Sequence, residues 1–149
     1  MSKKKTILIG LGVILVAIQF VPLNRTNPPV QGDITAPADI KKILRRSCYD
    51  CHSNETHWPL YSYAAPLSFW IVDHVNEGRE KLNFSTWEQM SSKDRSEAME
   101  EIGEEVEEGK MPLPSYLPLH PSAALSVEDR RLLQDWVRSR ARSEPEDRD

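Results

Sequence analysis

The feature that most restricts what this chain can become is its pair of cysteines. The chain of 149 residues has two, Cys48 and Cys51, separated by two residues, and His52 follows directly. Three kinds of site use such a pair: a redox-active dithiol, half of a zinc site, and the covalent attachment point of a haem group. Each kind requires different neighbours, so the surrounding sequence can distinguish among them.

The neighbours favour attachment of haem c. The Cys-x-x-Cys-His spacing brings two thiols onto one helical turn, where they can add to the vinyl groups of a porphyrin, and it places the histidine beneath the iron. A thioredoxin-like dithiol would follow a strand, whereas a helical pattern precedes Cys48. A zinc site is usually four-coordinate, and His57, His74 and His120 form no second pair at a set spacing. A simple disulfide and a metal site remain as alternatives.

The N-terminal segment is basic and then apolar. Three lysines at positions 3–5 precede an apolar run, Thr6–Leu23, which Gln19 alone interrupts. A membrane-spanning helix needs about 20 apolar residues. The apolar part of a cleaved signal peptide has about 7–15, followed by a small-residue cleavage site. No such site is evident, so we expect residues 1–23 to be an uncleaved anchor, with a cleaved signal peptide as the alternative.

Either alternative implies export of the remainder. Because basic residues tend to stay in the cytoplasm, we expect a single-pass protein of the bacterial inner membrane with its C-terminal domain in the periplasm. Residues 24–36 are polar and proline-rich and are expected to form a linker, residues 37–142 one domain, and residues 143–149 a charged tail. Without the four basic residues of the first 25 positions, the chain has 15 basic and 23 acidic residues, a formal charge of -8. This charge argues against nucleic acid as a partner.

The domain is predicted to be all-α, because no stretch shows the alternation typical of a strand. Pro37 can open a first helix that runs to Cys48, and a second helix is expected from near Pro66. Ser91 and Ser126 are each followed three residues later by an aspartate, a capping signal for two further helices. The residues that share one face of the second helix are mostly apolar: Leu67, Trp70, Ile71, His74, Val75 and Gly78.

A low-spin haem iron takes a second axial ligand, commonly methionine or histidine. Met111 is the first candidate, because it lies in a proline-rich loop after Gly109 rather than on the apolar face of a helix. His74, on the second helix, is the alternative. Met90 and Met99 are expected to be ordinary packing residues.

Taken together, these motifs resemble a known family. The segment "CYDCHSNETHWPLYSYAAPLSFWIVDHVNEGREKLNFSTW" is similar to the bacterial haem-binding domain family of membrane-anchored proteins, and the whole of Ala36–Arg140 resembles a class I-like cytochrome c with a single haem. The resemblance implies one covalent haem c per chain and a carbonyl, that of Pro59, which accepts the other N–H of His52. It also implies that the first and last helices pack together, through Ile40, Ile43 and Leu44 on one and Leu132, Leu133 and Trp136 on the other.

The predicted function is one-electron transfer between redox protein partners, with His52 and Met111 as the two axial ligands. A haem-based sensor of gas or redox state is the alternative, and it would require an open or displaceable sixth position. We do not expect an enzyme, since the sequence shows no acid–base pair suited to peroxidase chemistry.

Overall fold

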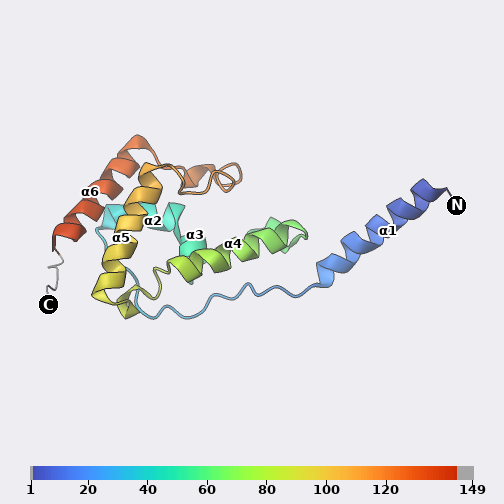
Figure 1. Cartoon of the computed structure of the whole chain (residues 1–149), viewed down its shortest axis with the longest axis horizontal. Coiled ribbons are helices and arrows are strands. Elements are labelled where there is room, and N and C mark those ends of the chain that lie inside the picture. The colour runs from blue at the N-terminus through green and yellow to red at the C-terminus, as the bar shows by residue number, and fades with distance from the viewer. Residues whose placement is uncertain (1, 144–149) are drawn as a thin grey trace.

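The computed structural model describes residues 2–143, and the regular elements in that range are all helices, with no strand (Figure 1). The prediction of an all-α domain is therefore confirmed. The predicted tail, residues 143–149, lies outside the described residues except for Ser143. The helices are α1 (Lys3–Ala17), α2 (Ala38–Ser47), α3 (Tyr49–His52), α4 (Leu67–Lys81), α5 (Ser92–Glu107) and α6 (Val127–Ser143), and short 3-10 turns span Ile18–Phe20, Leu60–Tyr63, Trp87–Gln89 and Pro121–Ala123.

The helices begin where the sequence signals predict. Ser91 Oγ accepts a hydrogen bond of 3.1 Å from the backbone N–H of Asp94 at the start of α5. At the start of α6, Ser126 Oγ accepts from the N–H of Asp129 at 3.0 Å, and the Asp129 carboxylate accepts from the N–H of Ser126 at 2.8 Å. These reciprocal bonds satisfy N–H groups that the first turn of a helix leaves without partners.

The core forms where α2, α5 and α6 meet. Leu44 of α2 and Leu133 of α6 are completely buried, and both belong to one apolar cluster with Met99 of α5. The implied packing of the first and last domain helices is thus confirmed. Deep burial of these branched side chains is the main favourable term in the stability of such a small domain.

The segment 24–36, expected to be a linker, packs along the domain and forms hydrogen bonds with it. The N–H of Gln31 donates to Ser85 O at 2.9 Å, and the N–H of Ile34 donates to Phe84 O at 3.1 Å. The Ile34 side chain is buried in the core cluster. An extended, proline-rich segment keeps its backbone N–H and C=O groups available, and here the turn after α4 pairs with them.

The expectation of a membrane-spanning helix over residues 1–23 is not supported. The helix α1 has 15 residues, a length of roughly 22 Å at about 1.5 Å per residue, against a hydrocarbon core of about 30 Å. Within residues 2–143, no helix has both the length and the apolar character to cross a bilayer. After a 3-10 turn the backbone becomes extended at Val21, the conformation that the following Pro22 favours.

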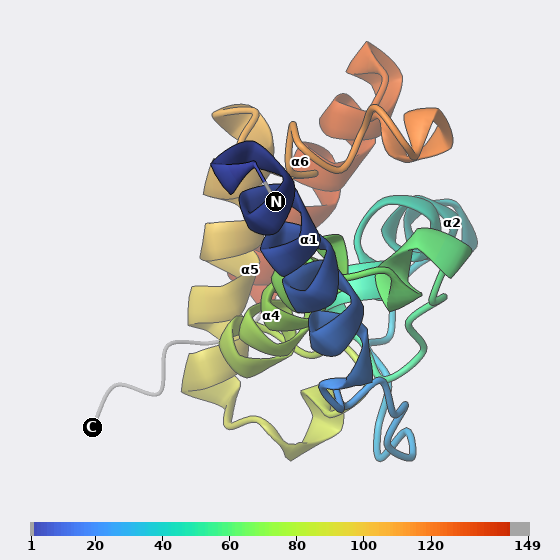
Figure 2. The same ribbon diagram turned by 90° about the vertical axis from the view of Figure 1, so that its right-hand side faces the viewer.

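The helix α1 projects away from the remaining helices, and Figure 2 looks along it with the N-terminus toward the viewer. Its apolar side chains are exposed from Ile7 to Val16. The contact with the domain is made just beyond its end, where the Gln19 amide pairs with both backbone groups of Ala65: Nε2 donates to Ala65 O and Oε1 accepts from Ala65 N–H, each at 3.0 Å.

Replacing Leu133 by alanine should test the importance of the α2–α6 core. The side chain is fully buried, so we expect a loss of about 2–5 kcal/mol in the free energy of unfolding, measured with urea. The matched control is Val127→Ala on the same helix, where the side chain is 87 % exposed and a change within about 0.5 kcal/mol is expected. Equal effects of the two substitutions would contradict the assignment of the core.

Candidate cofactor site

The two cysteines and His52 are brought together by a single turn of helix. Cys48 follows α2, and its carbonyl accepts hydrogen bonds from the N–H groups of Cys51 at 3.2 Å and of His52 at 2.9 Å. Both thiols are free. Because this turn is closed, all three side chains line one cavity, which is the convergence that the spacing predicts.

The imidazole of His52 is held by the C-terminal end of α4. Its Nδ1 lies 3.0 Å from Gly78 O and 3.1 Å from Leu82 O, so Nδ1 carries the hydrogen and donates it to these carbonyls. The other ring nitrogen, Nε2, is then unprotonated and suited to bind a metal. Burial lowers the pKa of His52, and this favours the neutral ring that a metal ligand requires.

The prediction that the carbonyl of Pro59 accepts the N–H of His52 is therefore wrong. The carbonyl of Pro59 instead accepts from the N–H of Ser62 at 2.9 Å and from its hydroxyl at 2.7 Å. Gly78 O also accepts from the N–H of Leu82 at 2.9 Å, so it offers His52 its second lone pair. Leu82 follows the last residue of α4, where C=O groups lack partners within the helix. Sequence reasoning had placed Gly78 on one face of this helix but could not predict which carbonyls would lie beside the histidine.

Gly78 permits this close approach of α4 to the motif. A Cβ atom at position 78 would lie 2.7 Å from the carbonyl oxygen of Cys51 and 3.2 Å from its Cβ. The first distance is shorter than van der Waals contact allows, and the atom concerned is backbone. A glycine is thus required for α4 to pack on α3 and offer its carbonyls to His52.

The thiols lack the character of a redox-active dithiol. Burial raises the pKa of Cys48 to about 12 and that of Cys51 to about 11, whereas reactive dithiols have a cysteine with a lowered pKa. Among residues 2–143, no group of three or more His, Cys, Asp or Glu side chains could hold a metal ion. The raised pKa values thus do not fit the redox-active dithiol among the alternatives.

The structure brings both candidates for the sixth ligand to the same place. Met111 and His74 line the cavity of about 760 Å³, open to solvent, that His52 also lines. His74 Nδ1 lies 2.9 Å from Trp70 O, one helical turn earlier, and donates to it, so its Nε2 is also available as a ligand. Both side chains thus reach the cavity that His52 lines.

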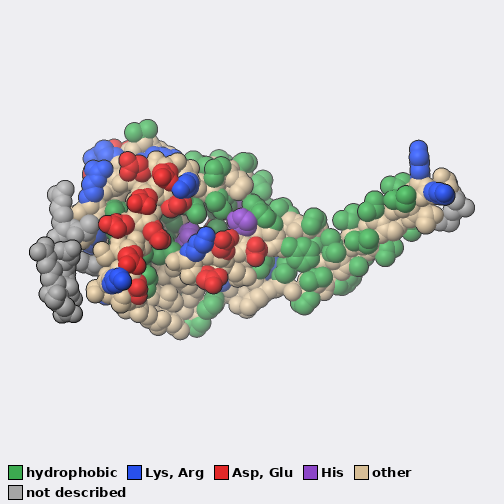
Figure 3. Space-filling view, in the orientation of Figure 1, with side chains coloured by type: hydrophobic (Ala, Val, Ile, Leu, Met, Phe, Trp, Pro, Cys, Tyr) green, Lys and Arg blue, Asp and Glu red, His purple; other side chains and the backbone are tan. Residues whose placement is uncertain are grey.

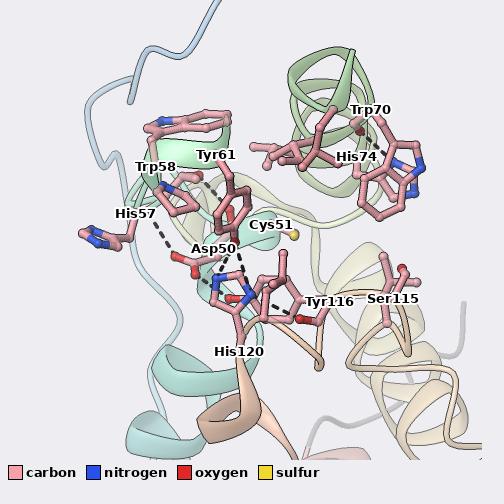
Figure 4. A pocket seen from close by; sticks show the side chains of 17 residues that line it. Asp50, Cys51, His57, Trp58, Tyr61, Trp70, His74, Ser115, Tyr116 and His120 are labelled. Carbon is pink, nitrogen blue, oxygen red and sulfur yellow. Dashed lines mark hydrogen bonds between the residues drawn. The ribbon is translucent and has the colours of Figure 1, made fainter. Parts of the chain in front are cut away.

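An aromatic cavity of about 630 Å³ adjoins the first (Figure 4). The two share Asp50, Cys51, His74, Leu113 and Tyr116 as lining residues, so they form one hollow beside the motif. Its mainly apolar, aromatic walls with a few polar groups are typical of a ligand site. The residues that line the aromatic part from other elements include Trp58, Tyr61, Leu67, Trp70, Ile71, Val75, Leu119 and His120.

The predicted apolar face of α4 lines this hollow as well as the core. Leu67, Trp70 and Ile71 all line the aromatic cavity, and Trp70 is 43 % exposed. Of the predicted face only Val75 and Gly78 are buried, together with Ser68 and Val72 from outside it. An apolar face that forms the wall of an open cavity supports the presence of a large apolar ligand there, because exposed aromatic surface is otherwise costly.

The two residues between the cysteines tie the motif to other parts of the chain, which the sequence analysis did not anticipate. The hydroxyl of Tyr49 donates to Asp33 Oδ1 at 2.6 Å, and its ring stacks on Phe84. Asp50 Oδ2 accepts from the hydroxyl of Tyr116 at 2.6 Å. The motif is therefore fixed on one side by the segment 24–36 and on the other by the loop before α6.

The model of a family described as haem-binding domain matches residues 13–139, most of the chain. No curated protein and no solved structure matches the chain significantly.

Gly78→Ala tests the packing of α4 against the motif. In a helix this substitution normally gains about 0.5–1 kcal/mol, but the clash with Cys51 O predicts a net decrease in the free energy of unfolding of the chain without cofactor. Gly12→Ala in α1 is the control, since nothing lies within 4 Å of its Cβ position. A stabilised Gly78→Ala protein would show that the close contact does not exist.

Proposed function

This chain belongs to the haem-binding domain family, and we propose that it holds one haem c covalently through Cys48 and Cys51, with His52 as an axial ligand. The observation that carries the proposal is the orientation of His52, whose Nδ1–H is bound to Gly78 O and Leu82 O while both thiols line the same cavity. A histidine fixed in this tautomer has the form that iron ligation requires.

The attachment needs only the two thiols and the two vinyl groups. Cys48 and Cys51 would hold the group through thioethers: each S–H bond would add across a vinyl C=C bond, giving a C–S bond and a C–H bond with nothing released. Since burial raises the pKa of both thiols, they stay protonated and uncharged in the apolar cavity. In this state they resist disulfide formation, because the thiolate is the reactive species.

We propose one-electron transfer as the activity. Haem, when bound, supplies an iron that gains or loses a single electron. The protein contributes two side chains that stay in place during the change, His52 and Met111, with His74 as the alternative to Met111. The aromatic side chains of the cavity, among them Trp58, Tyr61 and Trp70, exclude water, and both this exclusion and a thioether ligand raise the reduction potential.

We further propose that the domain works on the outer side of the bacterial inner membrane with redox proteins as partners. The three lysines at positions 3–5 followed by the exposed apolar residues of α1 support export. Figure 3 shows acidic side chains gathered over α5, where Glu97, Glu100, Glu101, Glu104 and Glu107 are exposed. This surface favours a partner with a basic face, which it would attract by long-range electrostatics.

Replacing the cysteines tests covalent attachment. Wild-type protein made together with a haem c maturation system should keep its haem on a denaturing gel, where the band shows peroxidase staining. We expect Cys48→Ser with Cys51→Ser to abolish this staining, since no thiol remains to form a thioether. The control Met99→Leu, a core change outside the cavity, should stain like wild type. Staining that survives loss of both cysteines would refute covalent attachment at this motif.

Substitutions at Met111 and His74 test the sixth ligand. Oxidised wild type should show the weak near-infrared band of an iron–sulfur bond, and Met111→Ala should lose the band and have a lower reduction potential. His74→Ala should retain both properties. Absence of the band from wild type, with a low-spin spectrum that Met111→Ala keeps and His74→Ala loses, would assign the position to His74. Rapid binding of carbon monoxide by reduced wild type would favour the sensor over the carrier.

A further inference from the structure

The loop that follows Met111 is held to distant parts of the chain at two points. Within residues 112–120, the hydrogen bonds to segments remote in the described sequence are those of Tyr116 with Asp50 at 2.6 Å and of His120 with Tyr61 at 2.8 Å. The remaining ones join neighbours within the loop, such as the N–H of Tyr116 to Leu113 O at 2.9 Å. Because only these two hydrogen bonds, here called the ties, join the loop to distant segments of the described chain, the position of the loop depends strongly on each of them.

The two ties support each other. His120 Nδ1 lies 3.2 Å from Tyr116 O and donates to it, which leaves Nε2 to accept the hydrogen of the Tyr61 hydroxyl. The His120 ring also stacks on that of Tyr116, with centroids 3.8 Å apart and planes inclined by 13°. Tyr116 is therefore fixed through its ring, its carbonyl and its hydroxyl.

The hydroxyl of Tyr116 acts as a permanent donor. Burial, together with the bond to the Asp50 carboxylate, raises the pKa of Tyr116, so the phenol does not ionise near neutral pH. A hydrogen bond to a charged acceptor is stronger than one between neutral groups. This makes the bond to Asp50 the stronger of the two ties.

The tie connects the proposed attachment motif with the loop that bears the proposed sixth ligand. Asp50 lies between Cys48 and Cys51, and it lines the aromatic cavity together with Tyr61, Tyr116 and His120 (Figure 4). At the other end of the loop, the N–H of Met111 donates to Glu105 O at 3.1 Å, which fixes it to the end of α5. The position of Met111 is thus set by α5 on one side and by Tyr116 on the other.

We propose that Tyr116, bound to Asp50 and stacked on His120, is a positioning residue that keeps the loop 111–120 over the haem cavity and Met111 within reach of the iron. This inference rests on the proposed function. Without the Tyr116 hydroxyl, the loop opens and the sixth position becomes accessible to external ligands. The hydrogen bond between Tyr116 and Asp50 therefore keeps the site closed, as an electron carrier requires, and its loss would give the open site that a sensor requires.

Tyr116→Phe is the test, because it keeps the ring stack on His120 and removes only the hydroxyl. In the haem-loaded full chain, we expect amide hydrogen exchange in residues 111–120 to rise about tenfold to a hundredfold, the range for loss of a bond to a charged group. The near-infrared band should weaken, and the reduced protein should bind carbon monoxide faster. Tyr63→Phe is the matched control, since that ring is 57 % exposed and lines neither cavity.

A second variant examines the same bond from its acceptor. Asp50→Asn retains an oxygen for the Tyr116 hydroxyl but loses the charge, so its exchange rates should lie between those of wild type and Tyr116→Phe. If Tyr116→Phe fails to fold, exchange of residues 111–120 that is faster in Asp50→Asn than in wild type supports the proposal, and rates equal to wild type overturn it. Unchanged exchange and carbon monoxide binding in a folded Tyr116→Phe protein overturn it as well.

The failure of the proposed function would look different. A wild-type chain that takes up no haem contradicts haem binding, and exchange in the apo chain then measures the tie alone. If a tyrosine-dependent protection of residues 111–120 persists there, the loop is positioned as we infer; if it is absent, the inference falls independently.

Discussion

The contact between the end of α4 and the Cys-x-x-Cys-His turn is the interaction on which the site depends. Gly78 and Leu82 present their carbonyls to His52 Nδ1, and the absence of a side chain at Gly78 allows the two backbones to meet. The contact does three things at once, because it packs α4 on α3, selects the tautomer of the histidine, and makes the ring more basic toward a metal. A buried N–H without these acceptors would carry a substantial cost.

The residues between the cysteines extend this constraint outward. Tyr49 reaches Asp33 in the segment before α2, and Asp50 reaches Tyr116 in the loop before α6. The segment 24–36 and the loop 111–120 have little regular structure of their own, so the motif organises both of them. The helical turn that carries the two cysteines therefore holds both segments beside the cofactor site through these two hydrogen bonds.

Local signals in the sequence were sufficient for the helices and for the motif. The caps at Ser91 and Ser126 and the apolar positions of α2 and α6 follow from short-range rules, and the structure confirms them. The acceptors of His52 could not be predicted, since they lie 26 and 30 residues away and depend on how α4 packs. The apolar face of α4 was seen, but periodicity alone does not distinguish a core from the wall of a cavity. The anchor was predicted from hydropathy over residues 1–23, whereas the helix ends at Ala17.

Peptide mapping after acid–acetone extraction tests the central claim most directly. Trypsin should release Ser47–Arg79, the peptide that contains both cysteines and His52, because no lysine or arginine lies between its ends. For protein made with a working maturation system, we predict that this peptide carries the mass of one haem and has no free thiol. An unmodified peptide, with two free thiols or an internal disulfide and all haem in the extract, would contradict the account.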